Sequence, residues 1–118
     1  TKGTTRHAYH LYMFRYDKRA FRGVPRRRFI EALTAEGVGC SAGYVPLYRE
    51  RIFVVDPAVD VFAGKVDYSK VRCPVCERAC TEESVWLYQR LLLGSKRDME
   101  DIANAIGKIQ ENADELRR

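Results

Sequence analysis

Hydrophobic and polar positions alternate most regularly near the C-terminal end of the chain. Apolar residues there recur at steps of three and four, the spacing of an amphipathic α-helix. They are Met99, Ile102, Ala103, Ile106, Ile109, Ala113 and Leu116. Ser95 precedes this run and Asp98 follows three residues on, which predicts a capping box with Asp in place of the usual Glu. We therefore predict a helix of roughly four or five turns, with Arg117 and Arg118 at its end.

The N-terminal part predicts a strand, a helix and a second strand. Residues 9–16 are rich in aromatic side chains on both faces, which predicts the central strand of a sheet. Pro25 suits the first turn of a helix, and Gly37 suits a left-handed residue at its end. The apolar face of this helix consists of Phe29, Ile30 and Leu33. Residues 38–44 are predicted to return as the second strand.

The middle of the chain is less regular. Residues 45–71 show no sustained period, which predicts a loop-rich excursion of the kind often used in binding, with residues 52–55 as a short strand. Pro74 then starts a short helix. It carries Cys76, Ala79 and Cys80 on one side. Residues 85–93 form the predicted third strand, which ends at Gly94.

The order of these elements indicates an α+β fold, a small sheet with helices packed on one face. The 118 residues are predicted to form a single domain, residues 1–118, and are enough to bury a core. Hydrophobic residues make up 46% and charged residues 31%, which is typical of a globular protein. No apolar run approaches the roughly 20 residues of a membrane span, and no signal peptide is apparent. We therefore expect a cytoplasmic location, with reduced thiols.

The charge balance is mildly basic. Twenty-one Lys and Arg against 16 Asp and Glu give a net charge of +5, which permits weak binding to nucleic acid or phosphorylated ligands but requires neither. Arg26, Arg27 and Arg28 follow one another at a predicted helix N-terminus, where phosphate often binds. Consecutive helical residues fan around the axis, so we expect solvated surface or a partner contact instead.

Four cysteines offer the most conspicuous local pattern, Cys73-x-x-Cys76-x-x-x-Cys80, with Cys40 elsewhere. The spacing is compatible with a zinc site, but a fourth ligand is missing unless Cys40 or a distant histidine supplies it. It is also compatible with a redox pair. We expect the third alternative, that Cys76 and Cys80 pack as small hydrophobic residues one helical turn apart, with no metal site. Phosphate-loop and dinucleotide-binding motifs are absent, and no nucleophile motif accompanies the two histidines.

Several short motifs resemble a known family when taken in order. They are residues 7–12 (HAYHLY), 43–48 (GYVPLY), 73–77 (CPVCE), 91–94 (LLLG) and 98–109 (DMEDIANAIGKI). Their order and spacing resemble the C-terminal part of the DegT/DnrJ-type sugar aminotransferases. The chain is most similar to the branch with 3-amino-5-hydroxybenzoate synthase and the inosose aminotransferases. The resemblance covers roughly residues 6–116.

The resemblance implies the C-terminal small domain of fold-type I pyridoxal-phosphate (PLP) transferases, with a three-stranded antiparallel sheet. It implies transfer of an amino group from glutamate or glutamine to a keto sugar or cyclitol, through a PLP–lysine Schiff base in the complete enzyme. The family lysine lies in a Ser-x-x-Lys segment of the large domain. None of the lysines here has that setting: Lys2, Lys18, Lys65, Lys70, Lys96 and Lys108. We therefore expect no catalytic and no cofactor-binding residue in this chain.

The resemblance also implies candidate substrate contacts. Tyr44, Tyr48 and Arg49 match the segment near the sugar-binding mouth, and Arg49 suits an anionic group. His10 and Tyr12 match first-strand positions near the active-site edge. The alternative is that these residues only pack against a large PLP-binding domain. That domain is the partner that the resemblance implies, and the family also implies a homodimer.

Two principal hypotheses follow for the chain. In the first, it is the substrate-shaping domain of a PLP-dependent aminotransferase and is inactive in isolation. In the second, it is a stand-alone, non-catalytic binding or assembly module that reuses the fold. A small zinc or nucleic-acid module is a third, less favoured hypothesis.

Overall fold

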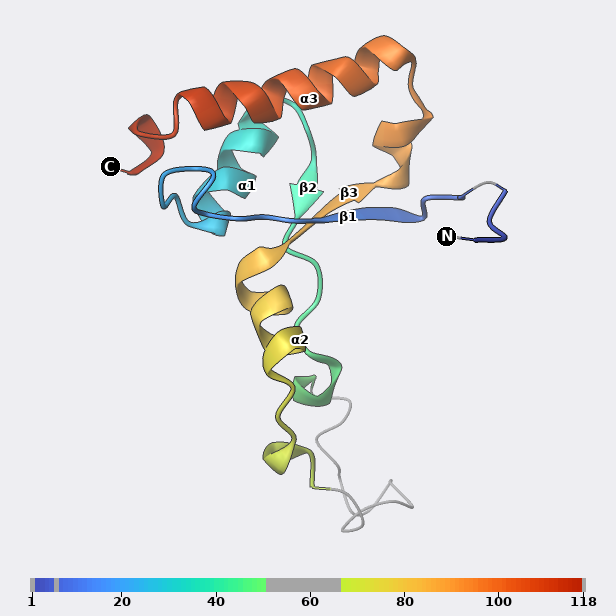
Figure 1. Cartoon of the computed structure of the whole chain (residues 1–118), viewed down its shortest axis with the longest axis vertical. Helices are drawn as coiled ribbons and strands as arrows, with labels where there is room; N and C mark the ends of the chain where they lie inside the picture. Colours follow the sequence, from blue (N-terminus) through green and yellow to red (C-terminus); the bar gives the residue numbers. More distant parts are fainter. Residues whose placement is uncertain (1, 6, 51–66, 118) are drawn as a thin grey trace.

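The computed structural model describes residues 2–5, 7–50 and 67–117 (Figure 1). Its elements follow the predicted order, and the α+β class is confirmed. They are β1 (Leu11–Arg15), α1 (Arg26–Ala35), β2 (Cys40–Ser41), a 3₁₀ turn (Leu47–Arg49), a second 3₁₀ turn (Tyr68–Lys70), α2 (Pro74–Arg78), a π-helical turn (Ala79–Glu83), β3 (Ser84–Tyr88), a 3₁₀ segment (Gln89–Leu93), α3 (Lys96–Glu111) and a last 3₁₀ turn (Glu115–Arg117). The predicted strand at residues 52–55 lies outside the described residues.

The sheet has the order β1-β3-β2, and β3 pairs antiparallel with both neighbours. The prediction that the first strand is central is therefore wrong, because β1 lies at an edge. Its large side chains on both faces do not indicate burial on both faces. Phe14 packs against the core, whereas Met13 on the opposite face is 60% exposed.

Helices α1 and α3 cover one face of the sheet and form the core with it (Figure 1). Phe29 and Leu33 of α1 are fully buried, as the apolar spacing predicts. Tyr16 stacks on Phe29 with 4.7 Å between ring centroids, and its hydroxyl donates to the Val24 carbonyl at 2.8 Å. Burial raises the pKa of Tyr16 to about 12. None of the helices in the described residues has the length and apolar character needed to cross a membrane.

The ends of the helices are largely as predicted. Ser95 and Asp98 form the capping box of α3, and Gly37 adopts the left-handed φ of 88° after α1. Helix α3, however, ends at Glu111. Arg117 lies beyond it in the last 3₁₀ turn, so its predicted place at the helix end is wrong; Arg118 is outside the described residues.

Two predicted strands are shorter in the structure. The second keeps only Cys40–Ser41, because Gly43 adopts a left-handed φ of 78° and turns the chain away from the sheet. The third ends at Tyr88, and the following apolar run forms the 3₁₀ segment Gln89–Leu93. A short apolar run alone does not distinguish a strand from a helical segment.

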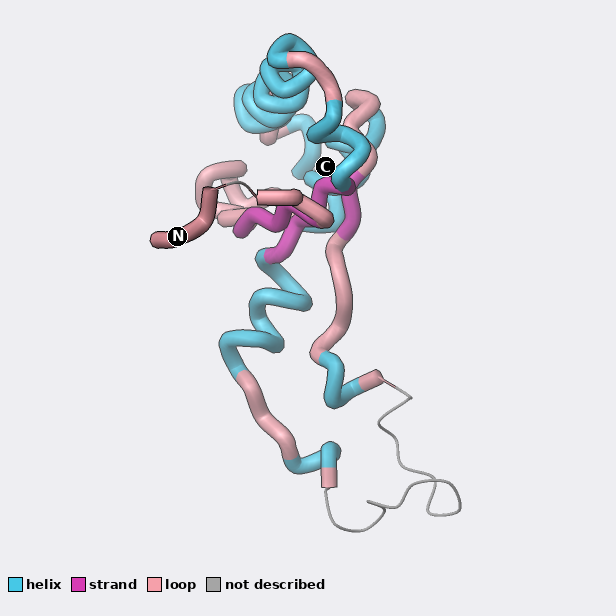
Figure 2. Tube along the Cα trace, turned by 90° about the vertical axis from the view of Figure 1, so that its right-hand side faces the viewer, coloured by secondary structure: helices cyan, strands magenta, loops and turns pink. Residues whose placement is uncertain are grey.

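Residues 43–50 and 67–83 form an arm that projects from the sheet on the side opposite α1 and α3 (Figures 1 and 2). The radius of gyration is 18.2 Å, compared with about 13 Å for a compact domain of this length. Hence the arm lies outside the core, and its two segments must be held at their base.

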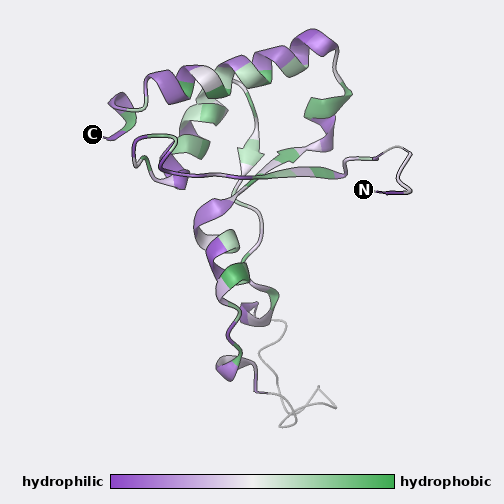
Figure 3. Cartoon of the chain, in the orientation of Figure 1, coloured by the Kyte–Doolittle hydropathy of each residue, from purple (hydrophilic) through white to green (hydrophobic). Residues whose placement is uncertain are grey.

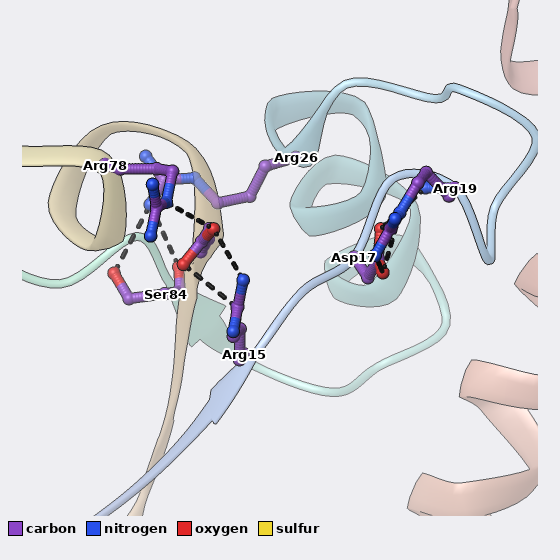
Figure 4. Close-up of polar contacts among 7 residues, drawn as sticks. Arg15, Asp17, Arg19, Arg26, Arg78 and Ser84 are labelled. Carbon is purple, nitrogen blue, oxygen red and sulfur yellow. Dashed lines mark hydrogen bonds and ion pairs between the residues drawn. The ribbon is translucent and has the colours of Figure 1, made fainter. Parts of the chain in front are cut away.

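Arg26 connects the two segments at the base of the arm. Its Nη1 atom lies 3.0 Å from the Ser84 carbonyl oxygen (Figure 4). The same atom lies 2.9 Å from the Cys80 carbonyl oxygen and 3.4 Å from that of Ala42. The Ser84 hydroxyl donates to Ala42 at 2.7 Å. The expectation of solvated surface is therefore wrong for Arg26, although Arg27 is exposed and pairs with Glu31.

A second tie joins the arm to β1. The Glu83 carboxylate accepts from Arg15 and Arg78, each with a nitrogen–oxygen distance of 3.0 Å (Figure 4). The Tyr16 backbone N–H also donates to the Glu83 carbonyl at 2.6 Å. These contacts connect the last turn of the arm to the start of β3 and to the edge strand.

Replacing Arg26 by Leu is expected to lower the free energy of unfolding by about 2 kcal/mol, because two carbonyl oxygens lose a charged donor. Replacing Arg27 by Leu is expected to change it by less than about 0.5 kcal/mol, because that side chain forms only an exposed pair one turn apart. Urea denaturation followed by Trp86 fluorescence measures both. Equal losses in the two variants contradict the role assigned to Arg26.

Candidate functional site

Tyr44, the first predicted substrate contact, is anchored where the arm leaves the sheet. Its ring meets Trp86 of β3 edge-to-face, with 4.8 Å between centroids. Gly43 permits this approach, since a Cβ atom there would overlap the Trp86 indole ring. Tyr44 itself remains 65% exposed, so most of its ring is free to contact a ligand or partner.

Tyr48 and Arg49 converge on one carboxylate of the arm, that of Glu77 in α2. The Tyr48 hydroxyl and the Arg49 Nη2 atom, the latter at 3.1 Å, both bond to Glu77 Oε1. The Cys73 backbone N–H donates to the same oxygen at 3.2 Å. We call these four residues, Tyr48, Arg49, Cys73 and Glu77, the Glu77 cluster. It joins the two segments of the arm.

The cluster has a defined charge state. The pKa of Glu77 is lowered, chiefly by the hydrogen bond from Tyr48 and then by the Cys73 N–H. Burial, followed by the bond to Glu77, raises the pKa of Tyr48. Glu77 is therefore ionised and Tyr48 neutral near pH 7. The Arg49 guanidinium carbon lies 5.6 Å from the Tyr48 ring centroid, and this side chain is 47% exposed.

The sequence did not single out Glu77 as a site residue. It appeared only within the motif at residues 73–77, and an acidic residue in the first turn of a helix has an ordinary dipole explanation. Its contact with Tyr48 spans 29 positions and depends on the way the arm folds back. No local sequence pattern indicates the contact between Tyr48 and Glu77.

His10 and Tyr12 lie apart from the arm. Tyr12 is on the helix-covered side of β1, where it lines a cavity of about 380 Å³ with Leu87 of β3 and Met99 of α3. Tyr44 packs on Trp86, which points to the opposite face of β3. His10 is exposed just before β1. The structure thus groups Tyr44, Tyr48 and Arg49 on the arm, with Tyr12 on the helix-covered side of the sheet and His10 outside β1.

An apolar surface accompanies the arm. Met13 and Trp86 face each other in register on the side of the sheet without helices, and Tyr88 follows on the same side. On the arm, Val45, Leu47 and Val75 are 51%, 62% and 71% exposed. Figure 3 shows hydrophobic stretches along the arm, outside the helix-covered core. We call these six residues together with Tyr44 the open face.

The lysines that the structure describes do not fit a PLP site. Lys70 pairs with Asp67 at 2.9 Å, Lys96 with Glu100 at 3.5 Å and Lys108 with Glu36 at 2.8 Å. Their side chains are 82%, 91% and 63% exposed. Lys2 and Lys18 are also exposed. A Schiff-base lysine needs an enclosed pocket with a site for the phosphate, so no step of the chemistry is assigned to these residues.

The cysteines of α2 and the following turn differ from expectation. Cys76 and Cys80 are one turn apart as predicted, but Cys76 is exposed, so the packing interpretation is wrong for it. Their sulfur atoms lie 4.0 Å from each other. Within residues 2–5, 7–50 and 67–117, no three or more His, Cys, Asp or Glu residues are grouped to hold a metal ion.

Comparison with known proteins gives consistent relatives. The chain is 37% identical over 120 residues to a putative L-glutamine:3-amino-2,3-dideoxy-scyllo-inosose aminotransferase of Streptoalloteichus tenebrarius, covering 96% of this chain and 29% of that protein. A protein of the same description from Streptomyces kanamyceticus is 32% identical over 119 residues, covering 95% and 28%. The L-glutamine:2-deoxy-scyllo-inosose aminotransferase of Streptoalloteichus tenebrarius is 35% identical over 121 residues, covering 98% and 28%.

The chain therefore spans less than a third of the length of the curated relatives it matches. No family model matches it.

Replacing Gly43 by Ala is expected to destabilise the protein by about 2 kcal/mol more than replacing Gly37 by Ala. Both glycines have a left-handed φ, but only at Gly43 does the added methyl group meet another side chain. Urea denaturation measures the loss, and the emission of Trp86, the one tryptophan, reports the displaced ring. Equal losses with unchanged Trp86 emission contradict the close packing.

Replacing Glu77 by Gln is expected to lower the pKa of Tyr48 toward its usual value of about 10, because the neighbouring negative charge disfavours tyrosinate. Tyr48 in the unchanged protein thus stays protonated to higher pH than in the variant. Tyrosinate absorbance against pH measures this, once the titration of a matching Tyr48→Phe variant is subtracted. A Tyr48 titration that is the same in the unchanged protein and in the Glu77→Gln variant argues against the cluster.

Proposed function

We propose that this chain, which matches a C-terminal fragment of the inosose aminotransferase family as its motifs predict, is the substrate-shaping domain of a PLP-dependent aminotransferase. The complete enzyme, of DegT/DnrJ type, acts on a keto sugar or cyclitol, and the present chain is inactive in isolation. PLP bound elsewhere in that enzyme supplies the amino-transfer chemistry. Residues of this chain bind and orient the reactants.

The observation that carries the proposal is the Glu77 cluster. It fixes Tyr48 and Arg49, two of the candidate substrate contacts, on the arm beyond the domain core. Glu77 takes up one side of the Arg49 guanidinium, and 47% of the side chain stays exposed. A guanidinium held in this way can bind an anionic group with its remaining N–H donors. The carboxylate of a glutamine or glutamate amino donor is such a group.

The proposed partner is the large domain of the same enzyme. The relatives are more than three times as long as their matched segments, so most of each relative lies outside this chain. The open face gives such a domain an apolar docking surface, which a lone compact domain seldom exposes. The arm, which carries part of this face, then reaches toward the site on the large domain. His10 and Tyr12 remain predicted contacts at the active-site edge, and a homodimer and a cytoplasmic location remain predictions.

A chimera tests the proposal. This chain replaces the matching segment of the 2-deoxy-scyllo-inosose aminotransferase of Streptoalloteichus tenebrarius, and glutamine-dependent transamination of 2-deoxy-scyllo-inosose is assayed. We expect turnover by the chimera and none by the chain alone. In the chimera, Arg49→Gln is expected to raise the KM for glutamine about tenfold with a smaller change in kcat, which corresponds to the loss of one charged hydrogen bond.

Arg27→Gln serves as the matched control, since Arg27 is exposed on α1 and lies outside the arm. Its KM is expected to stay unchanged. Turnover by the chain alone contradicts its inactivity in isolation. An active chimera in which Arg49→Gln behaves like the control contradicts the substrate contact and favours simple packing. A folded, PLP-loaded chimera without turnover favours a stand-alone module.

A further inference from the structure

Cys76 and Cys80 form a pair of thiols that the proposed function does not use. They lie on successive turns, Cys76 in α2 and Cys80 in the π-helical turn that continues it. Their Sγ atoms are 4.0 Å apart, and both cysteines are free. Cys76 is exposed and Cys80 is half-buried, so the pair is open to solvent on one side.

The separation of the two sulfurs discriminates between two kinds of chemistry. Two thiolates on one tetrahedral zinc ion, each about 2.3 Å from the metal, lie about 3.8 Å apart. A disulfide requires a separation of about 2 Å. The pair is thus within a few tenths of an ångström of a chelating geometry, whereas a disulfide requires the turn to deform. Metal binding needs only small side-chain rotations.

We propose that Cys76 and Cys80 form a binding site for one soft divalent d¹⁰ metal ion, of the class of Zn²⁺ and Cd²⁺. Thiolates are the preferred ligands of such ions. The two Sγ atoms bind the metal directly, and water completes its coordination. The site takes two ligands from the described residues, among which no group of three or more such side chains is found.

Binding exchanges protons for metal. Two thiols and one divalent ion give a metal dithiolate and two released protons. Arg26 fixes the backbone at Cys80, because its Nη1 atom donates to the Cys80 carbonyl oxygen at 2.9 Å.

Cys73 is the third cysteine of this segment. It is the N-cap residue of α2, it is exposed, and its backbone N–H already donates to Glu77. Because no group of three such ligands is found among the described residues, Cys73 is not assigned to the site.

Titration of the reduced chain with Cd²⁺ tests the site. Thiolate-to-cadmium charge-transfer absorbance measures binding, and native mass spectrometry counts the metal and the lost protons. We expect one Cd²⁺ per chain with two protons released, and at least a tenfold weaker Kd in Cys76→Ser and in Cys80→Ser. Cys73→Ser is expected to weaken binding less than either.

Cys40→Ser is the control, because Cys40 lies in β2 and contacts Thr34 and Ile30 rather than the arm. It is expected to bind Cd²⁺ like the unchanged chain. Circular dichroism confirms that each variant is folded. Retained affinity in a Cys76→Ser/Cys80→Ser double variant overturns the proposal, and so does a larger loss in Cys40→Ser or Cys73→Ser than in the pair variants.

Discussion

The arm depends on Arg26, because this one side chain bonds to both segments that connect the arm to the sheet. The carbonyls of Cys80 and Ser84 belong to the returning segment, and that of Ala42 to the outgoing one. Carbonyl groups in a partly buried junction need a donor, and a charged donor satisfies several of them at once. Since none of the core residues lies in the described segments of the arm, its direction is set at this junction.

From that junction, contacts lead outward along the arm. Tyr44 is fixed on Trp86 beside the sheet, and the Glu77 cluster then closes the two segments against each other farther out. The helix-covered core takes no direct part in these contacts, but it holds β3 in the centre of the sheet. The domain therefore separates a helix-covered base from a polar site carried at a distance on the arm.

Sequence patterns predicted the elements whose signals are local. Apolar spacing and the Ser95–Asp98 box indicate α3, and an apolar face followed by Gly37 indicates α1. The position of β1 in the sheet was missed because side-chain size does not reveal which face is covered. Arg26 and Glu77 were missed for a different reason: their partners lie 16 to 58 positions away for Arg26 and 29 away for the Tyr48 contact. Contacts between such distant residues follow from tertiary structure. The motif resemblance identified Tyr48 and Arg49 but not the Glu77 carboxylate that binds them.

The strand order has a consequence for synthesis of the protein. Among the described strands, the central strand β3 is the last in the chain, so β1 and β2 are both synthesised before the strand they pair with. The sheet closes only when Ser84 reaches Ala42, 42 positions earlier. The cost of closing such a loop rises only slowly with its length, by about 0.6 kcal/mol for each doubling. Evolution can therefore lengthen or shorten the arm at little thermodynamic cost, while the nascent chain must stay protected until β3 has emerged.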